Sequence, residues 1–215
     1  MRASKSILTL SVAALLAAGL ACNARLIESD GHWTVLGDPT EAAIVVASAK
    51  AGIDLERESR AQPRVHELPF DSYRKRMSTL HQTDAGHVLY VKGAPRELLT
   101  LCTRAAVDGA VVSIDEELRA WAASTNDDLS RRGLRVLAVA RRDIGERPSD
   151  PNAEVLERDL TLLGLVAMLD PPRPEVAEAV ATCQRAGIRP IMITGDYGLT
   201  AESIARRVGL VVGDQ

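Results

Sequence analysis

The stretch Val88-Leu89-Tyr90-Val91-Lys92-Gly93-Ala94-Pro95 predicts a strand, a glycine-permitted turn and the start of a helix. Branched and aromatic residues before Lys92 favour a half-buried strand. Pro95 suits the first helical position, where its missing N–H costs no hydrogen bond, and leucines give residues 96–104 an apolar stripe. A lysine at a strand end, beside a helix N-terminus, is able to hold an anion. A solvated lysine is the commoner arrangement and is the alternative interpretation.

The preceding residues predict a second strand, joined to the first by a short loop. The simplest register pairs His81 with His87. In that register Arg76 falls opposite Lys92, beside Lys75. Like charges that face each other across a ladder are destabilising, so this register favours an anionic ligand at the open end of the hairpin.

Phe70 is the only phenylalanine of the chain, and it lies just before this hairpin. A flat ring beside clustered cations can stack on a purine while the cations hold its phosphates, and such a stack is worth about 1–3 kcal/mol. A position in the hydrophobic core is the alternative interpretation of the ring.

Composition limits the possible classes of protein. The 215 residues suffice for one large or two small domains. Lysine and arginine number 26 against 29 acidic residues, a formal net charge of −3, so no basic surface for nucleic acid is indicated. The three cysteines lack the spacing of metal ligands, and reduced, buried thiols are expected.

The N-terminal residues allow two interpretations. A basic start followed by an apolar run over residues 7–21 has the outline of a secretory signal peptide, which would make the chain an exported binding or interaction protein. The run is short for a membrane span. The alternative is a helix that packs into the core through Leu8, Leu15, Leu16 and Leu20.

Residues 37–41 predict the beginning of a buried helix. Asp38 can cap it, Pro39 can be its first residue, and Glu41 can reach back as in a capping box. The charged residues 55–65 predict an exposed linker.

Residues 115–131 predict an amphipathic helix, and residues 133–140 predict a strand with Arg135 near its start. The planar donor fork of an arginine suits a phosphate or ribose. An exposed arginine at a sheet edge is the alternative.

The pattern changes at residue 160. The apolar run over residues 160–169 predicts a strand covered on both faces. Alternating helices and strands then follow, which predicts a parallel, doubly wound sheet. Ligands of such sheets bind at the carboxyl ends of the strands. The predicted elements are a helix over 175–186, a buried strand over 188–194, a helix from Thr200 to Val208 and a strand from Leu210.

Six segments, taken in order, resemble the P-type cation-transporting ATPases, and most of all their calcium-pump-like branch. The segments are Gly37-Asp38-Pro39-Thr40-Glu41, residues 69–75, Lys92-Gly93-Ala94-Pro95, residues 133–138, Asp170-Pro171-Pro172-Arg173 and Met192-Ile193-Thr194-Gly195-Asp196 with Thr200-Ala201.

The resemblance implies an α/β fold in two parts. Residues 1–169 would form an α+β, ATP-binding domain with a mainly antiparallel sheet and flanking helices, and the N-terminal apolar run would be one of these helices rather than a signal peptide. Residues 170–215 would begin a phosphorylation domain, as a partial β-α-β-α unit of a haloacid-dehalogenase-like Rossmann fold. A phosphatase of that broader class is less favoured, because its nucleophilic Asp-x-Asp strand is absent from the sequence.

The resemblance also implies roles for individual residues. Glu41 would lie near the adenine and Phe70 would stack on it, while Lys75, Lys92 and Gly93 would line the nucleotide pocket and Arg135 would reach the phosphates. Hinge and γ-phosphate contacts would fall to Asp170, Arg173, Thr194, Gly195 and Asp196. Arg96 departs from the family, which usually has a glutamate there.

The family's Asp-Lys-Thr-Gly-Thr-Leu-Thr segment, which carries the phosphorylated aspartate, is absent from this sequence. Covalent phosphoryl transfer requires its nucleophile. The chain is therefore expected to bind ATP without pumping ions or forming an aspartyl-phosphate, and no catalytic or metal-ligating residue is assigned. Magnesium ions would act only in a complete enzyme. The expected partners are the remaining phosphorylation, actuator and membrane domains of a pump, at the cytoplasmic face of a membrane.

Overall fold

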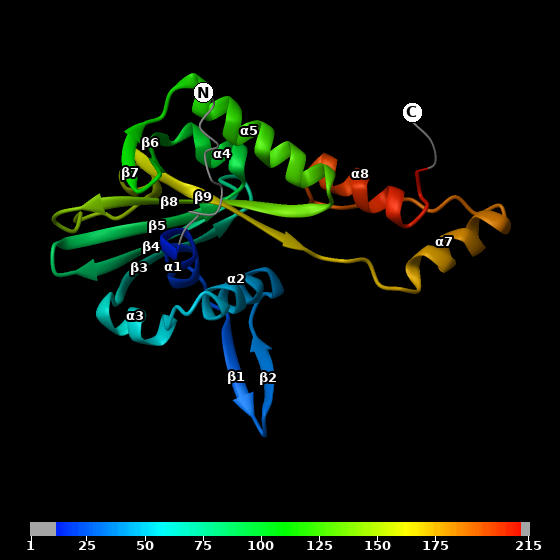
Figure 1. Cartoon of the computed structure of the whole chain (residues 1–215), viewed down its shortest axis with the longest axis horizontal. Coiled ribbons are helices and arrows are strands. Elements are labelled where there is room, and N and C mark those ends of the chain that lie inside the picture. Colours follow the sequence, from blue (N-terminus) through cyan, green and yellow to red (C-terminus); the bar gives the residue numbers. More distant parts are fainter. Residues whose placement is uncertain (1–11, 212–215) are drawn as a thin grey trace. The chain divides into compact units, whose positions relative to one another are not determined.

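The structure is a computed structural model that describes residues 12–211, in two compact units (Figure 1). The first unit comprises the described residues up to Arg119 together with residues 137–166. The second comprises residues 120–136 and those from Ala167 onward. The boundaries run through helix α5 (Glu116–Arg131) and strands β8 (Leu134–Ile144) and β9 (Leu160–Leu169).

A mixed sheet of seven strands, in the order β3-β4-β5-β8-β9-β6-β7, organises the first unit. Strands β3, β4, β5 and β8 pair antiparallel in turn, whereas β6 pairs parallel with β9. The predicted α/β class is confirmed. The remaining strands of this sheet are β3 (Arg64–Asp71), β4 (Arg76–Thr83), β5 (Gly86–Gly93), β6 (Cys102–Val107) and β7 (Ala110–Ser113).

The decisive stretch folds as predicted. Residues 86–93 form β5, whose last six residues are buried. Pro95 opens helix α4 (Pro95–Thr100) at one of its first two positions. The predicted helix over 96–104 is too long, because the chain enters β6 at Cys102.

The predicted hairpin register is wrong by one residue. His81 faces Val88, and Met77, not Arg76, lies opposite Lys92. The cause is the turn: Thr83 pairs with Gly86, so only two residues connect the strands. A shift of one residue moves every side chain to the other face of a sheet. Lys92 and Arg76 therefore lie on opposite faces.

Helix α1 (Val12–Leu20) packs against β5 and helix α2 (Pro39–Lys50). Leu20 is buried, and Leu15 and Leu16 are half-buried. The predicted core helix is therefore present over residues 12–20, whereas Leu8 and the start of the apolar run lie outside the described residues.

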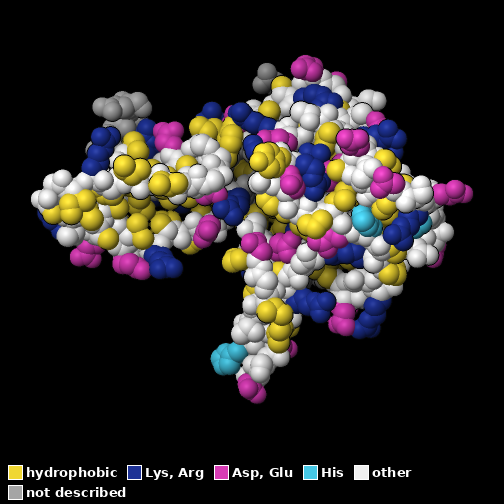
Figure 2. All heavy atoms as spheres, turned by 180° about the vertical axis from the view of Figure 1, so that it is seen from behind, with side chains coloured by type: hydrophobic (Ala, Val, Ile, Leu, Met, Phe, Trp, Pro, Cys, Tyr) yellow, Lys and Arg dark blue, Asp and Glu magenta, His cyan; other side chains and the backbone are white. Residues whose placement is uncertain are grey.

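Residues 55–65 are not the predicted linker. They form helix α3 (Leu55–Ala61), which Asp54 caps by accepting a hydrogen bond from Arg57 N, and they then enter β3. A two-stranded ribbon of β1 (Arg25–Ser29) and β2 (His32–Leu36) is mostly exposed and stands out from the first unit, as Figure 2 shows. A short helix, α6 (Ala153–Leu156), precedes β9.

The second unit contains helices α7 (Val176–Arg185) and α8 (Gly198–Arg207). The predicted strand over 188–194 does not form: these residues have no secondary structure, and Ile191 and Ile193 are exposed. A strand requires a neighbour to pair with, and none of the described strands lies along this segment. Leu210 and Val211 likewise belong to no strand, and α8 begins two residues before Thr200.

Cys22 and Cys102 are buried, free thiols as predicted, and Cys183 is a half-buried free thiol. Of the helices within residues 12–211, none combines the length and the hydropathy that a bilayer crossing requires.

Candidate functional site

Lys92 ends β5 as a buried ammonium in contact with two other groups. Its Nζ donates to Glu41 Oε1 at 2.7 Å and to Cys22 Sγ at 3.1 Å. Only 5% of the Lys92 side chain and 14% of the Glu41 side chain are exposed. The solvated alternative for Lys92 is therefore wrong, and its charge is balanced by a carboxylate of α2.

Glu41 occupies the first turn of α2, which Asp38 caps by accepting hydrogen bonds from Thr40 N and Glu41 N. The predicted capping box does not form. Glu41 Oε2 instead accepts from the backbone N–H groups of Asn23 and Ala24, at 2.7 and 3.0 Å. Burial raises the pKa of Glu41, but the hydrogen bond and charge of Lys92, with these two N–H groups, hold the pKa below its usual range.

Phe70 lies in β3, at the edge of the sheet, and 64% of the residue is exposed. The core alternative for this ring is therefore wrong. Its neighbour Asp71 pairs with Arg76, which pairs with Gly93 on the next strand. The register thus brings Phe70, Lys75 and Lys92 to the same end of three adjacent strands.

Lys75 sits at the end of the turn between β3 and β4, with a positive φ of 51°. Its Nζ donates to Glu97 Oε1 at 2.6 Å, and 56% of the Lys75 side chain and 34% of the Glu97 side chain are exposed. Its carbonyl oxygen accepts from Ala94 N at 2.9 Å. A Cβ at Gly93 would lie 2.6 Å from that oxygen and would overlap the Arg76 side chain, so only glycine permits this close approach.

The three cations at this end of the hairpin do not form an unbalanced cluster. Lys92 pairs with Glu41, Lys75 with Glu97, and Arg76 with Glu157. Their proximity therefore does not by itself require an external anion, and the like-charge pair of Arg76 and Lys92 that predicted one does not form.

Sequence reasoning missed Glu157, whose side chain is fully buried between Arg74 and Arg76. Nothing in the sequence distinguishes it from the other acidic residues of its loop. It also missed Cys22 beside Lys92, because the contact joins residues 70 positions apart.

In the second unit, two of the predicted groups meet. Arg135 Nη2 donates to Asp196 Oδ1 at 2.5 Å, and the Thr194 hydroxyl accepts from Asp196 N at 3.0 Å. Asp170 and Arg173 lie on the exposed connector after β9. The predicted strand end that would gather Asp170 with Thr194 is missing, because residues 188–194 form no strand.

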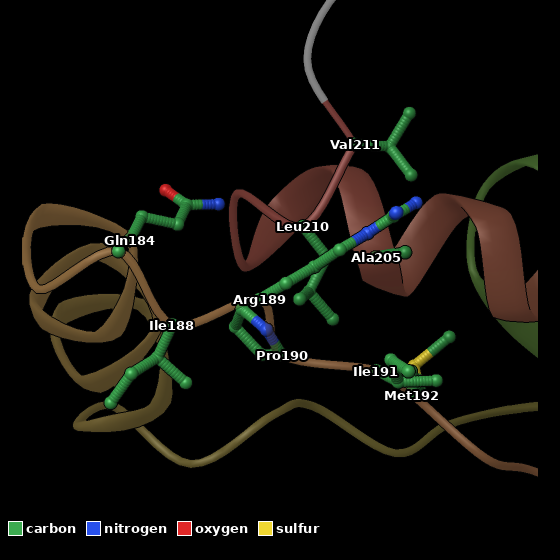
Figure 3. Close-up of a pocket in the computed structure, with 10 residues that line it drawn as sticks. Gln184, Ile188, Arg189, Pro190, Ile191, Met192, Ala205, Leu210 and Val211 are labelled. Carbon is green, nitrogen blue, oxygen red and sulfur yellow. The ribbon is translucent and has the colours of Figure 1, made fainter.

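A hollow of about 540 Å³ lies between α7, the segment after it and the end of α8 (Figure 3). Ile188, Met192 and Leu210 contribute apolar surface to its lining, and Gln184 and Arg189 contribute polar groups. None of the predicted site residues lines it. Over the described part of the chain, no group of three or more histidine, cysteine or acidic side chains is arranged to hold a metal ion.

Comparisons with known proteins agree with the motif pattern. The family model described as "P-type ATPase, cytoplasmic domain N" matches residues 11–175. The chain is 43% identical over 198 residues to the "Probable cation-transporting ATPase F" of Mycobacterium tuberculosis, covering 92% of this chain and 22% of that protein.

Two calcium-transporting relatives match over a similar range. The "Calcium-transporting ATPase 1" of Lactococcus lactis is 39% identical, over 92% of this chain and 22% of the relative. The "Calcium-transporting ATPase" of Bacillus subtilis is 40% identical, over 90% and 22%. The chain thus spans about a fifth of the length of these relatives.

Proposed function

Because the chain belongs to the family of P-type ATPase cytoplasmic N domains, we propose that its first unit binds ATP. The observation that carries the proposal is the exposed ring of Phe70 at the same strand end as Lys75 and Lys92. A base can stack on an exposed aromatic ring, and ammonium groups near the ring can hold the phosphates.

The chemistry of the residues at this end suits a nucleotide, because an aromatic face lies near two ammonium groups. The purine stacks on Phe70, with Glu41 on the side of the adenine. Lys75 and Lys92 face the phosphates. When ATP binds, each lysine either leaves its present carboxylate partner for a phosphate or contacts both. Gly93 has no side chain, which lets the turn that carries Lys75 pack directly against the end of β5 beside Lys92.

The second unit supports a finer proposal for the complete protein. Arg135 contacts phosphate, and Asp170, Arg173, Thr194, Gly195 and Asp196 serve the hinge and the γ-phosphate. Residues 170–215 begin a phosphorylation domain, and residues 188–194 become a strand of its haloacid-dehalogenase-like, parallel sheet. The exposed apolar side chains of Ile188, Ile191 and Ile193 support this, because a parallel strand is covered on both faces.

The complete protein is, in this proposal, an ATP-driven cation translocase of a membrane, as the names of the relatives suggest. Magnesium ions accompany its ATP, and the remaining phosphorylation, actuator and membrane domains are the partners of this chain.

Titration of the 215-residue chain with ATP, followed by NMR, tests nucleotide binding. We expect saturable shifts at residues around Phe70 and Lys92. Phe70→Ala should weaken binding by about 1–3 kcal/mol. Tyr73→Ala, which truncates a ring that is 94% exposed in the neighbouring turn, is the matched control and should leave affinity unchanged. The absence of saturable shifts, or equal losses in both variants, would overturn the proposal.

A further inference from the structure

Glu157, the residue that follows α6, is a fully buried carboxylate with three donors. Arg74 Nη1 and Ser78 Oγ donate to its Oε1, at 2.6 and 2.9 Å. Arg76 Nε donates to its Oε2 at 2.7 Å. All three donors lie in the β3–β4 turn or early in β4, 79 to 83 residues before Glu157 in the chain.

The two arginines extend this contact to the backbone of the turn. Arg74 Nη2 donates to the carbonyl oxygen of Pro69 at 2.7 Å. Arg76 Nη1 donates to the carbonyl oxygen of Arg74 at 3.0 Å. Pro69 directly precedes Phe70, and Arg74 directly precedes Lys75. The carboxylate thereby fixes the peptide groups beside both residues.

The conformation of the turn requires such support. Lys75 has a positive φ, which a residue with a side chain adopts at a cost. Without Glu157, the partly buried guanidinium groups of Arg74 and Arg76 would lie close together with no carboxylate between them. Asp71 and Gly93 still constrain the backbone there, so the expected result is a looser turn in a folded protein.

We propose that Glu157 is a positioning residue for the nucleotide, because it orders the turn that presents Phe70 and Lys75. The inference rests on the proposed function of ATP binding. Order that exists before binding lowers the entropic cost of association. Loss of the Glu157 carboxylate should therefore weaken ATP binding although no group that contacts ATP is removed.

The test compares Glu157→Gln with Glu154→Gln in the full chain. Both substitutions remove one negative charge, but Glu154 is an exposed residue of α6. Calorimetry measures the affinity for ATP. Limited digestion with trypsin measures the order of the turn, since Arg74, Lys75 and Arg76 are all trypsin sites. For Glu157→Gln we expect affinity about ten-fold weaker and cleavage at 74–76 about ten-fold faster, with no change for Glu154→Gln.

The outcomes separate the two proposals. If the unsubstituted chain does not bind ATP, the proposed function fails, and this inference with it. If that chain binds ATP, and Glu157→Gln binds equally well with an uncut turn, only the positioning role is overturned. If Glu157→Gln does not fold, Arg74→Lys decides, because it keeps the charge but cannot bridge Glu157 and Pro69. Unchanged affinity and an uncut turn in that variant would overturn the role.

Discussion

Lys92 Nζ lies 2.7 Å from Glu41 Oε1, and this contact joins the end of β5 to the first turn of α2 across 51 residues of sequence. Both side chains are largely buried. The pair therefore links the stability of the first unit to the groups proposed to bind ATP.

Lys92→Met should lower the free energy of unfolding by about 3–5 kcal/mol, because it leaves Glu41 as a buried carboxylate without its counter-charge. The double variant Lys92→Met/Glu41→Gln should recover part of this loss. Urea denaturation of the four proteins of this double-mutant cycle gives the coupling energy. If the losses in unfolding free energy of the two single variants simply add in the double variant, the contact between Lys92 and Glu41 has no coupling energy.

Acid should weaken the same contact. The folded-state pKa of Glu41 is lowered from an ordinary value of 4.5. The ionised Glu41 carboxylate therefore makes its full contribution to the free energy of unfolding above about pH 4.5, and this contribution is lost as the pH falls through the lower folded-state pKa. The difference in unfolding free energy between the unsubstituted chain and Glu41→Gln should therefore shrink on acidification. Urea titrations at a series of acidic pH values measure it, and a difference independent of pH would contradict the prediction.

Gly93→Ala should destabilise the first unit by about 1–3 kcal/mol, because the new methyl group has no room. Its Cβ would lie 2.6 Å from the carbonyl oxygen of Lys75. Gly145→Ala is the control, since nothing lies within 4 Å of a Cβ there. Thermal unfolding should separate the two variants, and equal melting temperatures would refute the close approach.

The three thiols should react at different rates with a disulfide reagent. Burial raises the pKa of Cys102 to about 12, and burial also raises the pKa of Cys22 against the charge of Lys92. Thiolates are the reactive form, so half-buried Cys183 should react first in the native chain. Mass spectrometry of the labelled peptides identifies the site. Labelling of Cys22 as fast as that of Cys183 would argue against the buried contact with Lys92.

Local signals in the sequence predicted local structure well. The branched residues of β5, Pro95 at the start of α4 and the Asp38 cap each act within a few residues of their position. The hairpin register was predicted incorrectly, since it depends on whether two or more residues form the turn. Helix α3 was predicted to be a linker because its sequence is highly charged, although Asp54 caps it.

Contacts between residues far apart in the sequence could not be predicted from such local signals. No pattern near Glu157 indicates that it reaches Arg74 and Arg76, and none near Glu41 indicates that it faces Lys92 rather than capping its own helix. The apolar sequence of residues 188–194 is typical of a strand, but strand formation depends on a neighbour that lies elsewhere in a chain. The site residues proposed from family resemblance remain predictions until binding is measured.

Lys92 and Lys75 each have an acidic partner within the protein. A triphosphate that binds these lysines replaces protein carboxylates as their counter-charges. It does not displace mobile salt ions from unpaired cations. Its affinity should consequently depend only weakly on ionic strength, and long-range attraction should add little to the speed of capture.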